Sequence, residues 1–282
     1  MIRFGPSGNG DLFYDQGYKS SLDAPLWVKN RGLNAYEYSF ARGFNVGDFV
    51  MKALGEKCKE NDVEISVHAP YYINLANPDE SMIEKSFNYI LTSLKYLKMM
   101  GGKRCVFHPG TCGKMSREEA FGLLEKNMVR LAEKIEEAGY SDMIVCPETM
   151  GKSMQLGTYE EIAKICKIAP FFVPALDFGH INCVLQGALK TESDFEKILK
   201  YMIDNVGLEK MKKVHIHFSK IEYGPKGEIK HLTFEDKVYG PEFEPLAKAL
   251  RKLGLEPDVI CESRGTQPED AGEMKRIYES LG

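Results

Sequence analysis

Short apolar runs alternate with longer amphipathic segments along the whole of this 282-residue chain. A run of four to eight apolar residues is typical of a buried strand, and apolar residues that recur every three or four positions indicate a helix packed on one face. We find eight such pairs. The predicted strands cover residues 2–5, 35–39, 64–68, 104–108, 144–148, 173–178, 213–217 and 259–262. The predicted helices lie near residues 18–31, 47–61, 79–100, 116–139, 158–168, 192–205, 242–253 and 268–281.

Strands that alternate with helices predict a parallel sheet, because each helix returns the chain to the start of the next strand. Eight such units are typical of a (β/α)8 barrel. Ser116 with Glu119 has the form of a capping box, and Gly139 and Gly254 stand where helices should end. Because no linker-like stretch interrupts the pattern, we expect a single barrel domain over residues 1–282.

The composition limits the cellular environments and the kinds of partner that this protein is expected to have. Hydrophobic residues make up 43% and charged residues 28%, which is ordinary for a compact protein with a large core. No run reaches the roughly 18 apolar residues of a membrane span, and the first residues do not resemble a signal peptide. We therefore expect a cytoplasmic protein without a membrane partner. The net charge of −4 provides no overall basic surface, so any contact with DNA would rest on a local patch.

The cysteines indicate reduced thiols. All seven are scattered without a CxxC pair, and an odd number argues against a complete secreted disulfide framework.

Histidines and carboxylates close the predicted strands from the third to the eighth. They are His68, His108, Glu148, Asp177 followed by His180, the pair His215 and His217, and Glu262. The active site of a βα barrel forms at the carboxyl ends of its strands, so we expect these side chains to meet. The remaining histidine, His231, lies in an irregular stretch at 219–241 that we expect to form a functional loop over the same face.

This arrangement predicts a metal site. A single buried histidine is more often part of the core, but imidazoles and carboxylates together are ligands that zinc and manganese accept. Several carboxylates held close to one another would also repel strongly without cations. On the seventh strand, His215 and His217 must share one face because side chains alternate. We take His215 as the ligand, with His217 as an outer hydrogen-bond partner or a substitute ligand.

The motifs around these residues resemble the endonuclease IV family of apurinic/apyrimidinic endonucleases, within the wider xylose isomerase-like barrel superfamily. The resemblance covers essentially the whole chain. Its most specific pieces are HAPYYINLANP (68–78), FHPG (107–110), PETMGKSMQLG (147–157), LDFGHINC (176–183), HIHFSK (215–220) and CES (261–263).

The resemblance implies a centre of two or three zinc ions, with manganese as an alternative. Glu148 would bridge the first two ions. The implied ligands of the first ion are His68, His108 and Glu148, and those of the second are Glu148, Asp177, His215 and Glu262.

The third ion of the family would be held by His180, His231 and an aspartate two residues before His231. Ile229 occupies that position and cannot bind a metal. The third ion is therefore bound with the help of Glu228 or His217, bound weakly, or absent.

The resemblance further implies a monomer that hydrolyses DNA on the 5′ side of abasic sites during base excision repair, with Glu148 and Glu262 as catalytic residues. Tyr71 matches a tyrosine that helps to fill the distorted duplex, with rim packing as the alternative. Arg42 and Lys220 are further candidates for DNA contact, although solvated charge is the ordinary role of such residues. Other candidates for phosphate contact are Lys152, Lys226, Lys230 and Arg264.

Two other functions suit the same scaffold. A sugar isomerase or epimerase would hold one Mn²⁺ or Mg²⁺ ion with Glu148, Asp177, His215 and Glu262, and its paired glutamates would move a proton beside a carbonyl. That chemistry does not require the other histidines. A non-catalytic barrel, stabilised by metal and binding nucleic acid or a small ligand, is the second alternative.

Overall fold

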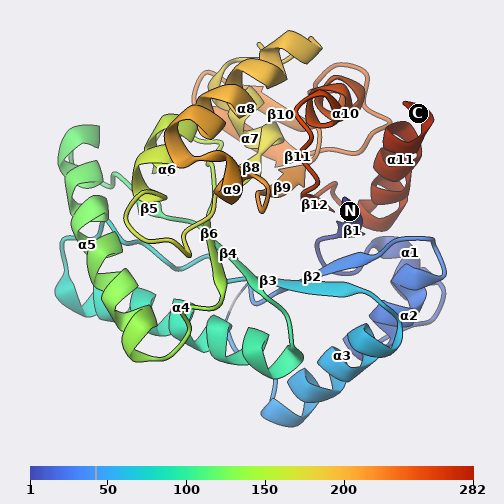
Figure 1. Cartoon of the computed structure of the whole chain (residues 1–282), viewed down its shortest axis with the longest axis horizontal. Coiled ribbons are helices and arrows are strands. Elements are labelled where there is room, and N and C mark those ends of the chain that lie inside the picture. The colour runs from blue at the N-terminus through green and yellow to red at the C-terminus, as the bar shows by residue number, and fades with distance from the viewer. Residues whose placement is uncertain (42) are drawn as a thin grey trace.

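The computed structural model describes residues 1–41 and 43–282, and its centre is a TIM barrel of eight parallel strands (Figure 1). The strands are β1 (Arg3–Pro6), β2 (Ala35–Ser39), β3 (Glu64–His68), β4 (Arg104–Phe107), β6 (Ile144–Pro147), β8 (Ala175–Asp177), β9 (His215–Phe218) and β12 (Asp258–Cys261). They form two four-stranded sheets, in the orders β1-β12-β9-β8 and β2-β3-β4-β6. Parallel bridges from Ser7 to Glu37 and from Glu148 to Ala175 join the sheets and close the barrel.

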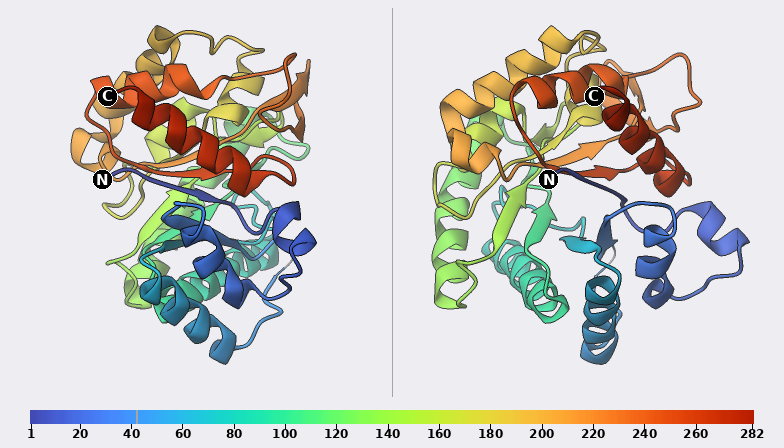
Figure 2. Two further views of the ribbon diagram at one scale, coloured as in Figure 1. Left: turned by 90° about the vertical axis from the view of Figure 1, so that its right-hand side faces the viewer. Right: turned by 45° about the vertical axis from the view of Figure 1, so that its right-hand side comes forward.

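Helices surround the strands on the outside (Figure 2). The long ones match the predicted segments: α3 (Asp48–Glu60), α4 (Glu80–Met100), α5 (Arg117–Glu137), α6 (Tyr159–Ile165), α8 (Glu192–Val206), α10 (Phe243–Lys252) and α11 (Gln267–Ser280). The capping box of Ser116 and Glu119 is confirmed, since each side chain accepts from the other residue's backbone N–H. Gly139 and Gly254 adopt positive φ angles just beyond helix ends, as predicted.

Two predicted segments are corrected by the structure. Instead of one helix at 18–31, the chain forms α1 (Asp11–Asp15), a 3-10 turn (Ser21–Asp23) and α2 (Ala24–Lys29). Pro25 explains this, because proline lacks a backbone N–H and fits only the first turn of a helix.

The stretch at 219–241 is not wholly irregular. It begins with an antiparallel hairpin of β10 (Ile221–Gly224) and β11 (Gly227–His231). The remaining short elements are α7 (Phe178–Val184), α9 (Leu208–Met211) and a ribbon of β5 (Gly110–Thr111) and β7 (Gln155–Leu156).

Alternation along the strands separates the core from the site. On β9, Ile216 and Phe218 pack in the large core beneath the helices, while His215 and His217 point into the barrel. A small apolar cluster that includes Val106 and Ala175 fills part of the barrel interior. The polar side chains therefore lie on the inward face of strands whose outward face holds the core.

All seven cysteines are buried and free of disulfides. Within the described residues, no helix is both long and apolar enough to cross a membrane.

Candidate metal centre

The first group of ligands comes from three neighbouring strands. His68 ends β3, while His108 and Glu148 follow β4 and β6 directly. The Nε2 atoms of both histidines lie 3.2 Å from Glu148 Oε2. His68 Nδ1 lies 2.8 Å from the Ala69 carbonyl, and a proton donated there leaves the Nε2 lone pair facing Glu148. One ion could therefore be held by two imidazoles and one carboxylate oxygen.

The second group uses the other oxygen of Glu148. Its Oε1 lies 3.0 Å from His217 Nδ1, and Glu262 Oε1 lies 3.5 Å from the same nitrogen. Asp177 completes the group. Asp177 Oδ2 is buried without a hydrogen-bond partner among the described residues and lies 3.2 Å from His180 Nδ1, whereas Oδ1 accepts from the backbone N–H of His180. Because a buried carboxylate needs a positive partner, Asp177 Oδ2 fits the binding of a cation.

His217 takes the position that we predicted for His215. Both histidines point inward, but His215 stands two residues earlier on β9, roughly 6–7 Å deeper in the barrel. The structure therefore places it beside Glu37, outside the second group. Alternation alone specifies the face of a strand but not the depth at which a side chain meets its partners.

The third group consists of His180, Glu228 and His231. Glu228 Oε2 lies 3.6 Å from His180 Nε2, and Glu228 Oε1 lies 3.8 Å from His231 Nε2. The Nδ1 atoms of both histidines are engaged elsewhere, with the Thr149 carbonyl at 3.0 Å and Ser219 Oγ at 2.9 Å. Both Nε2 atoms therefore face the carboxylate.

A β-bulge explains why Glu228 stands here in place of the family aspartate. Glu222 pairs with Lys230 and Tyr223 pairs with Glu228, so Ile229 is an extra residue in β11. The extra residue shifts the alternation by one position, which puts Glu228 on the face of His231. The side chain of Ile229 is 57% exposed to solvent. Of the alternatives for the third ion, this geometry favours the one that uses Glu228.

Glycines allow the hairpin to approach the centre. A Cβ atom on Gly151 would lie 2.7 Å from His180 Cδ2 and 2.9 Å from Glu228 Cβ. Gly227 has a φ of +92°, and a Cβ there would lie 2.0 Å from the Gly151 carbonyl oxygen. Larger residues at either position would separate Glu228 from His180.

Burial and charge set the protonation of the centre. Burial would raise the pKa of the Glu148 carboxyl, but His217, His108 and His68 hold it well below its usual value. Burial raises the pKa of Glu262, with His217 opposing the shift. Burial would lower the pKa of His180, yet the carboxylates of Asp177, Glu148 and Glu228 raise it to about 9. Without metal, the imidazole of His180 therefore holds a proton that a cation would displace.

The three groups open into a cavity of about 540 Å³. Tyr71 lies at its rim, 54% exposed, with its ring stacked on His108 at a centroid distance of 5.3 Å. Lys152 and Arg264 line the same cavity and supply positive charge.

Lys220 does not face this cavity, contrary to its prediction as a substrate contact. It is 2% exposed, and its ammonium group donates to Glu242 Oε1 at 2.7 Å and to the Asp236 carbonyl at 2.8 Å. These bonds hold the segment that follows the hairpin. Arg42, the other predicted cation, lies outside the described residues.

Glu37 was absent from the predicted site. It stands in the middle of β2 and is fully buried against His215 and His217. A charged residue between the tyrosines of AYEYS could have been recognised as inward-facing, but the sequence does not reveal its partners on β9.

The fold agrees with comparisons to known proteins. Residues 25–281 match the profile of the xylose isomerase-like TIM barrel family, and the chain belongs to that family. It is 34% identical over 254 residues to an uncharacterized protein of Methanocaldococcus jannaschii, covering 90% of each chain. It is 29% identical over 177 residues to a probable endonuclease 4 of Aquifex aeolicus, covering 61% of each. The predicted resemblance to endonuclease IV is thus confirmed.

Solved structures agree on the fold. Endonuclease IV from Thermus thermophilus superposes with a TM-score of 0.69 at 20% identity, covering 99% of this chain and 98% of that one. A D-tagatose 3-epimerase-like protein superposes with a TM-score of 0.74 at 18% identity and the same coverage. At these identities the likeness concerns the fold alone.

Proposed function

We propose that this protein is a metal-dependent phosphodiester hydrolase that cuts DNA on the 5′ side of abasic sites. The observation that carries the proposal is the position of Glu148, whose two oxygens serve two ligand groups while the third group lies beside them. His180 Nδ1 is 3.6 Å from Glu148 Oε1, so the three groups form one connected centre. Nitrogen and carboxylate donors of this kind suit zinc, and manganese accepts them as well.

The side chains around the centre have separate roles in this proposal. When bound, the metal ions would neutralise the phosphodiester and lower the pKa of a water molecule. Glu148 links the first two ligand groups and fixes the distance between them. Glu262 lines the cavity, where it can accept the proton of the attacking water. Lys152 and Arg264 contact phosphates of the DNA backbone, and Tyr71 packs against the opened duplex.

A second candidate is a sugar epimerase or isomerase with one metal ion. The observation in its favour is that Glu148, Asp177, His217 and Glu262 form one group of possible ligands that includes two glutamates, which follow β6 and β12. This candidate leaves five ordered ligands without a use. They are His68, His108, His180, Glu228 and His231.

One preparation can distinguish the two functions. The protein would be purified without chelator, its bound metals measured by mass spectrometry, and its activity tested on a labelled duplex with one abasic site. An undamaged duplex and a panel of ketoses would serve as controls. Two or three zinc or manganese ions with a cut 5′ to the lesion support the proposal. One ion, an intact duplex and conversion of a ketose would replace it with the second candidate.

A further inference from the structure

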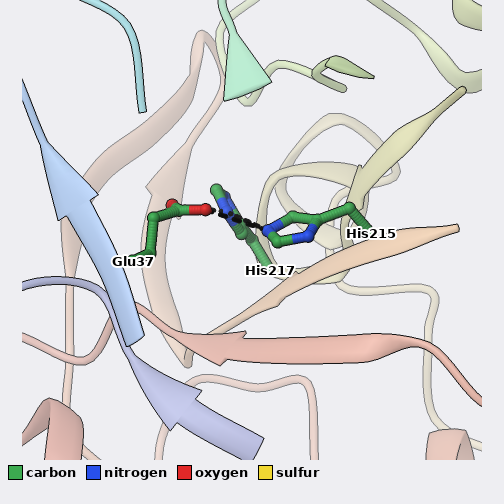
Figure 3. A group of neighbouring side chains, drawn as sticks. All are labelled: Glu37, His215 and His217. Atoms are coloured by element: carbon green, nitrogen blue, oxygen red, sulfur yellow. Dashed lines mark hydrogen bonds and ion pairs between the residues drawn. The ribbon is translucent and has the colours of Figure 1, made fainter. Parts of the chain in front are cut away.

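Glu37 is a fully buried carboxylate that contacts the second ligand group through His217. Figure 3 shows its carboxylate pointing toward His215 and His217. Glu37 on β2 faces two histidines of β9, with His215 Nε2 3.0 Å from its Oε2 and His217 Nε2 2.9 Å from its Oε1. Ser66 Oγ donates to Oε2 at 2.8 Å. Among the described residues, no group forms a hydrogen bond of regular geometry with Oε1, and His217 Nε2 is the ion-pair partner within reach of it. The polar contacts of Glu37 are therefore made by the two imidazoles and Ser66.

The three side chains could hold a metal of their own, or the carboxylate could orient the imidazoles. The surroundings of His215 Nδ1 distinguish these arrangements, because this atom is buried and has no hydrogen-bond partner in the part of the chain that the structure describes. If His215 Nε2 bound a cation, the ring proton would sit on Nδ1 and have no acceptor, which is costly in a buried site. A proton on Nε2 instead can be donated to Glu37, and Nδ1 then carries only a lone pair.

The same protonation suits His217. With its proton on Nε2, facing Glu37, the ring presents the Nδ1 lone pair to the second group, 3.0 Å from Glu148 Oε1. The two Nε2 atoms lie 3.2 Å apart, within hydrogen-bond distance of each other, because both rings approach one carboxylate. Metal-binding histidines commonly donate their other N–H to a carboxylate in this way.

We propose that Glu37 is a positioning residue for the second metal ion, acting through His217. It fixes the tautomer and orientation of that imidazole, while His215 and Ser66 hold the carboxylate in place. The inference rests on the proposed function only in requiring that the second group binds a metal.

The substitution Glu37→Gln tests this role at constant shape. A glutamine offers one acceptor and one donor, so it cannot accept from both imidazoles. If its NH2 group faces His217, the ring proton moves to Nδ1 and competes with the metal. We expect zinc affinity at the second group to fall roughly 10–100-fold in chelator competition, as for other outer partners of metal ligands. Ser66→Ala is the matched control, because it removes a bond to the same carboxylate but keeps both imidazole contacts, and we expect a smaller loss.

Thermal unfolding separates positioning from a merely structural role. If Glu37 acts through the metal, Glu37→Gln lowers the Tm of the zinc-loaded protein more than that of the metal-free protein. Equal losses in both forms, together with unchanged zinc affinity, would overturn the proposal. Cleavage of abasic DNA by the wild type would stand regardless, whereas a wild type that binds no divalent ion would overturn both inferences.

Spectroscopy on the wild type covers the case in which the variant does not fold. The protein would be loaded with cadmium-113 and labelled with nitrogen-15 histidine. We expect cadmium coupling to His217 Nδ1 and a protonated His217 Nε2. Coupling to His215, or to His217 Nε2, would instead assign the three buried side chains to an ion of their own and disprove the proposed role.

Discussion

At the scale of single residues, Glu148 has the largest consequences because it belongs to two ligand groups. In Glu148→Gln one oxygen becomes an amide nitrogen, which cannot bind a cation. We expect metal content and cleavage to fall together, the rate by at least about 100-fold, beyond the range typical of outer partners. Metal analysis and a cleavage assay on the same sample would measure this.

Glu196→Gln is a suitable control for that experiment, since Glu196 is a buried carboxylate on α8, bonded to Lys200 and Lys252 away from the centre. It should keep the full metal content. A Glu148→Gln protein with normal stoichiometry and full activity would remove the basis of the bridging role.

The two histidines of β9 give a second prediction at this scale. His217→Asn should lose the second ion, because His217 Nδ1 faces Glu148 and Glu262. His215→Asn should keep it with reduced affinity, since His215 contacts Glu37 and His217 Nε2, whereas the second group faces the other ring nitrogen of His217, Nδ1. Metal content of the two variants, measured side by side, checks the order. Loss of the ion in His215→Asn alone would restore the sequence-based choice of ligand.

The pKa of His180 predicts a pH dependence. Burial would lower this pKa, but Asp177, Glu148 and Glu228 raise it to about 9, so the ring is protonated at neutral pH without metal. An ion at the third group must displace that proton. Its affinity should therefore rise with pH, by up to about tenfold per unit, and level off above about pH 9. Calorimetric titration in two buffers of different ionisation enthalpy would detect the released proton. If the affinity did not change between pH 6 and pH 9, the prediction would be wrong.

At the scale of elements, the regular strands and helices could be predicted and the connections could not. The strands 35–39 and 64–68 match β2 and β3, because their apolar runs end at a polar residue facing the site. The predicted strand 173–178 is shorter in the structure, where Asp177 caps α7 by accepting from His180 N–H. The hairpin of β10 and β11 escaped prediction because its register depends on a bulge that no periodic pattern reveals.

The bulged hairpin yields a prediction of its own. Glu228→Gln should remove the third ion and leave the first two, because Glu228 supplies the carboxylate that faces both His180 and His231. Glu222→Gln is the matched control on the opposite strand, where Glu222 pairs with Lys230 at 3.0 Å. Metal content should fall by one ion in Glu228→Gln and stay unchanged in Glu222→Gln. Equal losses in both variants would mean that the hairpin acts through its fold and not through a ligand.

At the scale of the whole molecule, the eight strand–helix pairs in the sequence predicted the barrel. The histidines and carboxylates at the strand ends predicted the metal centre. Six neighbouring strand ends were enough to predict a metal site, since closure of the barrel brings them together. The depth of each side chain, which decides between His215 and His217, depends on strand register and on Glu37 across the barrel. Those are tertiary properties that one sequence does not specify.

The ligands also predict how metal affects the stability of the molecule. They come from the ends of β3, β4, β6, β8, β9 and β12, from α7 and from the hairpin, so bound ions would connect both four-stranded sheets. A ligand present at about 1,000 times its Kd stabilises a fold by about 4 kcal/mol. At about 2–4 °C per kcal/mol for a chain of this size, chelation should lower the Tm by roughly 8–16 °C. Calorimetry with and without chelator measures the shift, and Glu148→Gln should show a much smaller one. If the Tm of the wild type were the same with and without chelator, the strand ends would be stable in the barrel without bound metal.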